Sequence, residues 1–289
     1  MERKEIQVPY STGRKVPKLQ IPELTCDTHC HIFDPVRFPY KPTDTRNQPP
    51  ATVDVYRMLQ SRLGMKRCVI VTPSSYGADN RCTLDAVKQL GKDARAVIVL
   101  RGDESKEELQ QLHVQGVRGV RFNVASGASD NIEQIQRTAD QIVELGWHIV
   151  FWMSADLTVK YAKELEKLPC QIVFDHRGHL PADQGIRHEA FGVITDMMKE
   201  KHAFVKLSAL YHDSVKENYE DTIAVGKAYA EIAPEQLLWA TDWPHHSEFI
   251  TRKEMPDDAK LLDSLIEQIP DEKTRNQILV DNPARLYGF

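Results

Sequence analysis

The sequence has little of what marks membrane, secreted or nucleic-acid-binding proteins. Among its 289 residues, no apolar run approaches the ~20 residues that cross a bilayer. The charged first segment, MERKEIQVPYSTGRKVPK, is not followed by the apolar core of a signal peptide. Lysine and arginine total 37 against 42 aspartates and glutamates, a net charge of −5, so no basic excess faces a nucleic-acid backbone. We therefore expect no membrane or nucleic-acid partner.

Cysteine and nucleotide-binding glycine motifs are also scarce. The five cysteines are odd in number and include no CxxC pair, which predicts a reduced, cytoplasmic protein. No GxGxxG or GxxxxGK[ST] motif follows a candidate strand, and that removes the usual reason to expect a nucleotide-binding open sheet. A hydrophobic content of 41% with 27% charged residues is ordinary for a globular chain and argues against disorder.

The sequence does contain a regular alternation of short apolar runs and helical patterns. The candidate strands are Leu24–His29, Arg67–Thr72, Ala94–Leu100, Gly119–Asn123, Trp147–Met153, Gln171–Asp175, Phe204–Ser208 and Leu237–Thr241. Helical spacing is found in Val53–Leu63, Glu107–Gln115, Ile132–Leu145, Leu157–Leu168, Ala190–Lys201, Tyr219–Ala233 and Asp257–Gln268. Runs such as CVIVT and HIVFW are apolar throughout, as in parallel strands that are covered on both faces.

This pattern predicts an α/β fold. We expect a single (β/α)8 barrel over residues 21–289, preceded by a polar arm at residues 1–20. A doubly wound open sheet is the alternative, because the same alternation builds both.

Polar residues recur where candidate strands end, and catalytic groups of such barrels lie at those ends. The segments concerned are Asp27-Thr28-His29-Cys30-His31, Arg121-Phe122-Asn123, Asp175-His176-Arg177 and Thr241-Asp242-Trp243. His29 and His31 are two residues apart, so they face the same way on a strand. Each residue alone is compatible with a structural role, but their common position at one end of four strands predicts a shared site.

These motifs carry a resemblance. DTHCHIFDP, GVRGVRFN, FDHRGH, LLWATDWPH and LVDNPARLYGF resemble the amidohydrolase superfamily, and more closely its branch of 2-pyrone-4,6-dicarboxylate lactonases and related sugar-lactone hydrolases. The similarity runs from about Leu24 to Phe289. It implies a distorted (β/α)8 barrel and hydrolysis of a small lactone.

The resemblance also implies roles for matching residues. Asp242 corresponds to the general base that takes a proton from the attacking water. His29, His31 and His176 correspond to the histidines around the scissile carbonyl, where an imidazole stabilises the developing oxyanion. Arg121 corresponds to a clamp on a substrate carboxylate, for which the guanidinium fork is suited.

The chain departs from the dicarboxylate lactonases at several positions. The stretch 124–128 lacks the second arginine of that branch, and Thr45-Arg46-Asn47 stands where an aromatic residue is usual. Arg46 and Arg177 are candidates for the missing charge, while Ser74, Ser75 and Tyr76 are candidate polar contacts or parts of an ordinary turn. An acidic or hydroxylated lactone, such as a sugar-acid lactone, is therefore expected rather than the pyrone dicarboxylate itself.

The metal content is open from sequence. The set His29, His31, His176 and Asp242 suits one zinc ion. The fifth strand carries only His148 at its wrong end and the fourth ends without a bridging lysine, so a binuclear centre is not expected. The lactonase branch implies hydrolysis without a metal, which we expect here, with one zinc as the alternative. A zinc-dependent hydrolase or decarboxylase, a lactone isomerase and a sugar-acid binding protein stay open, and so does a homo-oligomer.

The remaining histidines carry weaker expectations. His113, His188, His202 and His212 lie in helical or loop contexts and are expected to be solvated. His179, His245 and His246 flank the motifs, either as substrate contacts or as loop residues. Lys206 is assigned no role.

Overall fold

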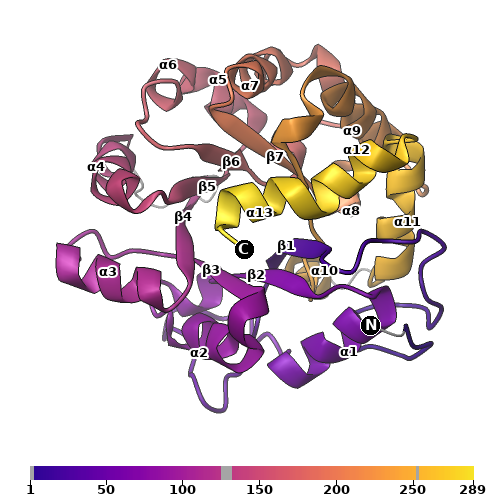
Figure 1. The fold of residues 1–289 in the computed structure, drawn as a ribbon, viewed down its shortest axis with the longest axis horizontal. Helices are drawn as coiled ribbons and strands as arrows, with labels where there is room; N and C mark the ends of the chain where they lie inside the picture. Colours follow the sequence, from indigo (N-terminus) through magenta and orange to yellow (C-terminus); the bar gives the residue numbers. More distant parts are fainter. Residues whose placement is uncertain (1–2, 125–131, 252–253) are drawn as a thin grey trace.

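The computed structural model describes residues 3–124, 132–251 and 254–289. It contains one sheet of eight parallel strands in sequential order, as the sequence predicts. The strands are β1 (Cys26–Cys30), β2 (Arg67–Val71), β3 (Ala94–Ile98), β4 (Val117–Asn123), β5 (His148–Trp152), β6 (Ile172–Phe174), β7 (Ala203–Leu207) and β8 (Leu237–Trp239). Figure 1 shows them as a ring with helices outside, a nearly closed (β/α)8 barrel.

Thirteen α-helices are described. They are α1 (Val53–Leu63), α2 (Arg81–Leu90), α3 (Lys106–Val114), α4 (Ile132–Ile142), α5 (Ala155–Lys160), α6 (Ala162–Leu165), α7 (Glu189–Lys199), α8 (Leu210–Asp213), α9 (Glu220–Ile232), α10 (His246–Thr251), α11 (Asp258–Gln268), α12 (Glu272–Asn276) and α13 (Asn282–Tyr287). The predicted helix over Leu157–Leu168 is interrupted at Tyr161, and α2 is an addition to the prediction. No helix among the described residues is long and apolar enough to span a membrane.

The barrel interior is filled from one end by apolar side chains. Val69, Val97, Val150 and Phe204 belong to a buried cluster that α13 completes with Leu286 and Tyr287. In Figure 1, α13 crosses the opening of the ring. The guanidinium of Arg95 donates to the carbonyls of Tyr287 and Gly288, so α13 covers the end where the strands begin. The polar groups therefore gather at the opposite end.

A bulge in β1 decides which way its histidines point. Asp27 pairs with Cys68 and Cys30 pairs with Ile70, so β1 contains one more residue than β2 between these two pairs. In a regular strand without a bulge, Cys26 and Cys30 are four residues apart and would share a face. Instead Cys26 belongs to the interior cluster and Cys30 to the layer beneath the helices, because the bulge reverses the alternation.

Side-chain and loop hydrogen bonds hold β1 against β8. The Asp27 carboxylate accepts from the Thr241 amide at 2.9 Å and from the Thr241 hydroxyl at 2.6 Å. Beyond the strand ends, the Asp242 amide donates to the His29 carbonyl at 2.9 Å. These bonds fix the chain after β8 against the chain after β1, which brings two predicted site segments together.

Residues 3–20 form no helix or sheet strand and lie against the barrel. The buried Arg62 guanidinium donates to the carbonyls of Thr12 and Lys15, and the Trp243 indole donates to the carbonyl of Pro9. The segment is thus held by α1 and by the turn after β8. Its treatment as a separate arm stays a prediction.

Candidate active site

A cavity of about 200 Å³ opens at the carboxyl ends of the strands. It is lined by His31, Arg46, Pro73, Ser74, Arg121, Asn123, Trp152, His176, His212, Asp242, His246, Ser247 and Ile250. These residues come from strand ends and loops around the whole ring. The lining combines imidazoles, one carboxylate, two guanidinium groups and hydroxyls.

Asp242 lies among the predicted histidines. Its Oδ1 is 3.6 Å from Nε2 of His29, 3.9 Å from Nε2 of His31 and 3.8 Å from Nε2 of His176. Its Oδ2 accepts a hydrogen bond of 2.8 Å from the hydroxyl of Tyr211. Asp242 also has a positive φ of 65°, which turns the side chain from the end of β8 into the ring. The four groups that the sequence associates therefore share one centre.

The proton positions on the two β1 histidines follow from their partners. Nδ1 of His31 is 2.7 Å from the carbonyl oxygen of Val71, which can only accept, so this nitrogen carries a proton. Neutral His31 then has a lone pair on Nε2. Nε2 of His29 lies 3.2 Å from that atom. A hydrogen bond between the two rings requires His29 to be the donor.

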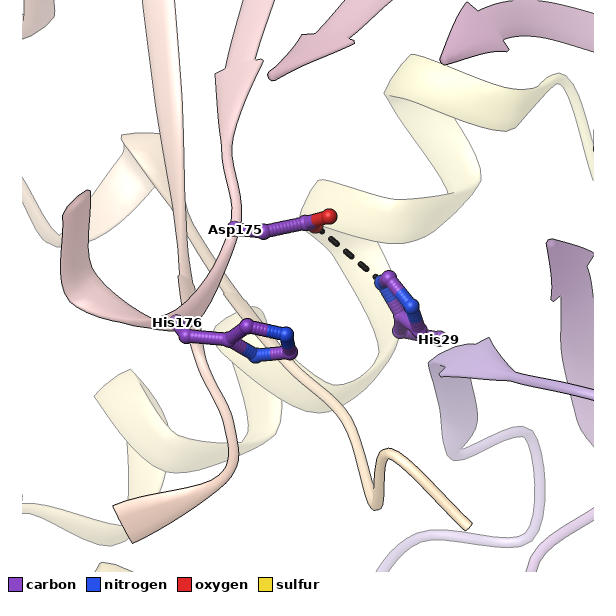
Figure 2. A group of neighbouring side chains, drawn as sticks. All are labelled: His29, Asp175 and His176. Atoms are coloured by element: carbon purple, nitrogen blue, oxygen red, sulfur yellow. Dashed lines mark hydrogen bonds and ion pairs between the residues drawn. The ribbon is translucent and has the colours of Figure 1, made fainter. Parts of the chain in front are cut away.

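Behind His29 lies a buried cluster of charges that Figure 2 shows in part. Asp175 follows β6, and its Oδ1 is 3.1 Å from Nδ1 of His29. The Lys206 ammonium, on β7, is 2.9 Å from the same oxygen and 3.0 Å from the same ring nitrogen. Nε of Arg121 is 3.9 Å from the other Asp175 oxygen. Asp175 therefore carries the negative charge that both cations need in the barrel interior.

Burial and these charges set the ionisation of the site. Burial lowers the pKa values of His29, His31 and His176, which keeps the rings neutral near pH 7. Burial alone would raise the pKa of Asp242, but the surrounding imidazoles, His176 foremost, bring it well below its usual range. Burial likewise opposes the ionisation of Asp175, and His29 with Lys206 brings the pKa of that carboxyl well below its usual range. Both carboxyls are ionised at neutral pH.

Two of the three predicted arginines line the cavity. Arg121 does so with a side chain that is 10% exposed. Arg46 is held by a side-on ion pair with Asp44 and donates to the Ser74 hydroxyl at 2.8 Å. Arg46 therefore keeps part of its guanidinium edge directed at the cavity in spite of its carboxylate partner.

The structure does not bring Arg177, Ser75 and Tyr76 to the cavity. The chain takes positive φ angles at His176 and Arg177, so the turn after β6 points the first inward and the second away. The Arg177 guanidinium is buried and donates to the carbonyls of Ser208 and Ala209. Ser75 is buried, and the Tyr76 hydroxyl accepts from the Asp34 amide. In the loop after β2 it is Ser74 that faces the cavity.

The comparison with known proteins agrees with this geometry. The sequence pattern of the amidohydrolase family matches residues 26–289. The chain belongs to this family. The 2-pyrone-4,6-dicarboxylate hydrolase of Comamonas testosteroni is 34% identical over 94% of this chain and 92% of its own length. A 4-sulfomuconolactone hydrolase of Rhizobium radiobacter is 35% identical over 93% and 91%.

Solved structures support the same amidohydrolase barrel. A ligand-free crystal structure from Agrobacterium tumefaciens superposes with a TM-score of 0.86 at 25% identity, and the match covers 97% of this chain and 98% of that one. The eight-stranded prediction from sequence is confirmed.

Two functional candidates, His212 and Tyr211, were missed in the sequence, and Asp175 and Lys206 were named there without a role. His212, expected to be solvated, lines the cavity with Nε2 3.5 Å from Oδ2 of Asp242 and its ring stacked on His176 at 4.9 Å. Tyr211 holds the same Asp242 oxygen, and Asp175 and Lys206 hold His29. Lys206 had a detectable signal, because it lies two residues after the inward-facing Phe204. His212 had none, since its place depends on the path of the loop after β7.

The donor set also fits one metal ion. In a tetrahedral zinc site with bonds of about 2.0–2.1 Å, ligand atoms lie about 3.4 Å apart. The ring nitrogens of His29 and His31 are 3.2 Å apart, and each is within 4 Å of Oδ1 of Asp242. A second group joins His176 and His212 to Asp242. Amidohydrolases often use a metal, and this amidohydrolase has residues that suit one.

Proposed function

We propose that this amidohydrolase opens the ring of a small lactone that carries an anionic or hydroxylated end. The main support is the position of Asp242, whose Oδ1 lies within 4 Å of three histidine nitrogens in a cavity that two arginines border. The relatives named as hydrolases of a pyrone dicarboxylate and of a sulfomuconolactone support the same reaction class. Both names describe cyclic esters with an added anionic group.

The proposed reaction starts with a water molecule beside the Asp242 carboxylate. Asp242 takes one proton as the water oxygen attacks the lactone carbonyl carbon, and the carbonyl oxygen becomes negatively charged. An N–H of His176, which lines the cavity, donates to this oxygen. Preorganised donors of this kind typically contribute about 3–4 kcal/mol to an acyl-transfer transition state. His31 lines the same cavity, with His29 behind it.

The ring then opens. The tetrahedral intermediate collapses, the bond from the former carbonyl carbon to the ring oxygen breaks, and that oxygen takes the proton back from Asp242. The products are a hydroxyl or enol group and a carboxylic acid on one chain, and the acid releases its proton to solvent as a carboxylate forms. Asp242 is ionised again for the next cycle, as its lowered pKa requires.

The two guanidinium groups suit the anionic end of the substrate. Arg121 lines the cavity, and its Nε approaches Asp175 at 3.9 Å without a hydrogen bond to any described residue, so the guanidinium can pair with a bound anion. Arg46 adds positive charge from the loop after β1, at a position that distinguishes this chain from the dicarboxylate lactonases. The stretch 124–128, where the second arginine of that branch is missing, lies outside the described residues from 125 on.

We propose that this hydrolysis needs no metal ion. If a zinc ion is bound, His29, His31, His176 and Asp242 would hold it, and it would supply an acidified water and polarisation of the carbonyl. The work of Asp242 as a proton acceptor and of Arg121 as an anion clamp is the same in either case. A location in the reducing cytoplasm is also proposed, and the five free, buried cysteines support it. Formation of a homo-oligomer and the lack of nucleic-acid partners stay predictions.

The test is Asp242→Asn against a panel of acidic lactones and sugar-acid lactones. We expect kcat to fall by about 10²–10⁴-fold with little change in KM, because the substitution removes the base and keeps the shape. Asp196→Asn is the control, since Asp196 is an exposed carboxylate on α7. Turnover of the Asp242 variant at the parent rate would remove the base from this proposal.

The same panel separates the competing activities. Hydrolysis in H₂¹⁸O places one labelled oxygen in the product carboxylate, whereas a lactone isomerase that moves the ring between hydroxyls incorporates none. Tight lactone binding without turnover would instead favour a binding protein. Metal analysis of protein purified without added zinc, together with chelator treatment, tests the metal-free proposal.

A further inference from the structure

Lys206 is a buried cation that the proposed reaction does not use. It is fully buried on β7, and its ammonium reaches two atoms, Oδ1 of Asp175 at 2.9 Å and Nδ1 of His29 at 3.0 Å. A salt bridge with Asp175 alone would satisfy its charge. The second contact is unusual, because an ammonium has only N–H donors and an imidazole nitrogen accepts only when it carries no proton.

Donor and acceptor roles form a chain across three residues. The Val71 carbonyl accepts, so Nδ1 of His31 is protonated and its Nε2 is bare. Bare Nε2 of His31 accepts from Nε2 of His29 at 3.2 Å, so that nitrogen carries the His29 proton. Nδ1 of His29 is then bare and accepts from Lys206. In this arrangement each of these contacts joins a donor to an acceptor. One contact between two acceptors is left, that of Nδ1 of His29 with Oδ1 of Asp175 at 3.1 Å, and the Lys206 ammonium lies beside both atoms.

The alternative proton position has a partner too. With its proton on Nδ1, His29 would donate to Asp175 at 3.1 Å and present a lone pair on Nε2 to the cavity. That arrangement of carboxylate, histidine and lone pair is the one found around zinc ligands. It would leave the N–H groups of Lys206 and of His29 facing each other at 3.0 Å, and two lone pairs facing each other between His29 and His31.

We propose that Lys206 holds the proton of His29 on Nε2, so that this nitrogen offers no lone pair and resists ligation of a metal ion. Lys206 is a positioning residue, since it acts through His29. The position of the proton and its effect on metal binding do not rest on the proposed function.

The test is Lys206→Met, which keeps the length of the side chain and removes its charge and donors. Nitrogen-15 spectra of histidine-labelled protein report which ring nitrogen is protonated, and His29→Gln identifies the His29 signals. The parent protein is expected to show His29 protonated on Nε2. In the variant the proton is expected to move to Nδ1, toward Asp175.

Zinc binding is the second readout, measured by competition with a chelating dye. We expect Lys206→Met to bind zinc about 10–100-fold more tightly than the parent, the usual size of an effect from a residue behind a metal ligand. Lys199→Met is the matched control on an exposed lysine of α7, and it is expected to leave both readouts unchanged. Lys206→Arg keeps a cationic donor and is expected to retain the parent spectrum.

Three results would overturn the inference: a parent His29 protonated on Nδ1, a spectrum that does not respond to Lys206→Met, or zinc affinity that does not rise. If Lys206→Met fails to fold, the parent spectrum still decides. None of these readouts involves a lactone, so failure of the proposed function and failure of this inference are separate outcomes.

Discussion

His148 provides a quantitative prediction about stability at acid pH. It lies at the start of β5, is 1% exposed and has no hydrogen-bond partner for either ring nitrogen among the described residues. Its ring packs edge-on against Tyr287 at 4.9 Å. Its pKa is lowered to about 3, mainly by burial and also by the Lys206 ammonium, while Asp175 opposes the shift.

The magnitude follows from proton linkage. Between the unfolded pKa of about 6.5 and the folded pKa of about 3, the unfolded chain binds one more proton at His148, so stability falls as the pH falls. Each pH unit well inside that window costs about 1.4 kcal/mol. Between pH 7.5 and pH 5.0, His148 alone therefore removes about 2 kcal/mol from the free energy of unfolding.

The assay is urea unfolding of the parent and of His148→Leu at several pH values. Leucine has a similar volume and does not titrate, so the variant should lose about 2 kcal/mol less than the parent between pH 7.5 and 5.0. Other buried histidines titrate in both proteins and cancel in the difference. Between pH 7.5 and 9 that difference should be constant, which serves as the internal control. Parallel stability curves down to pH 5 would refute the reasoning.

Two further predictions concern the cavity. Arg121→Gln should raise KM for an anionic lactone by about 10–100-fold with a smaller effect on kcat, because it removes a charge-assisted hydrogen bond. Arg46→Gln should raise KM by less, because Arg46 already pairs with Asp44. Steady-state kinetics with a neutral lactone is the comparison, and equal losses on neutral and anionic substrates would contradict the assignment. His212→Asn should shift the acid limb of the kcat/KM profile to higher pH, because His212 helps to lower the pKa of Asp242. An unchanged acid limb would exclude that influence.

The strands were predictable because most are buried on both faces. Runs such as CVIVT and AVIVL are apolar throughout, which indicates strands that are buried on both faces, and their regular spacing along the chain favours a parallel barrel. Helix α2 was missed in the sequence. The residue before it, Asn80, forms no side-chain cap, so no capping interaction marks where the helix begins. Helix α3 was close to its predicted bounds, and its capping box at Ser105 and Glu108 marks its start.

The site residues that directly follow a strand were predictable from the sequence, and those placed by loops were not. Asp242, His29, His31 and His176 follow strands directly, so the ring brings them together. Arg177 shows the limit of that reasoning, because the left-handed turn after β6 reverses its direction and no residue pattern reveals the turn. Asp175 was visible beside His176, but its partner Lys206 lies on another strand, and only the closed ring shows the pair.

The bulge in β1 links the closing of the barrel to its chemistry. Asp27, before the bulge, anchors Thr241, while His29, after it, faces Asp242 and also accepts the Asp242 amide hydrogen bond through its carbonyl. The length of this short stretch is therefore constrained from two sides. Straightening the bulge with the sequence unchanged would reverse the alternation beyond Asp27 and turn both imidazoles outward. The same few residues hold the first and last strands together and place the histidines beside Asp242. A substitution in this segment is therefore expected to affect both barrel stability and catalysis.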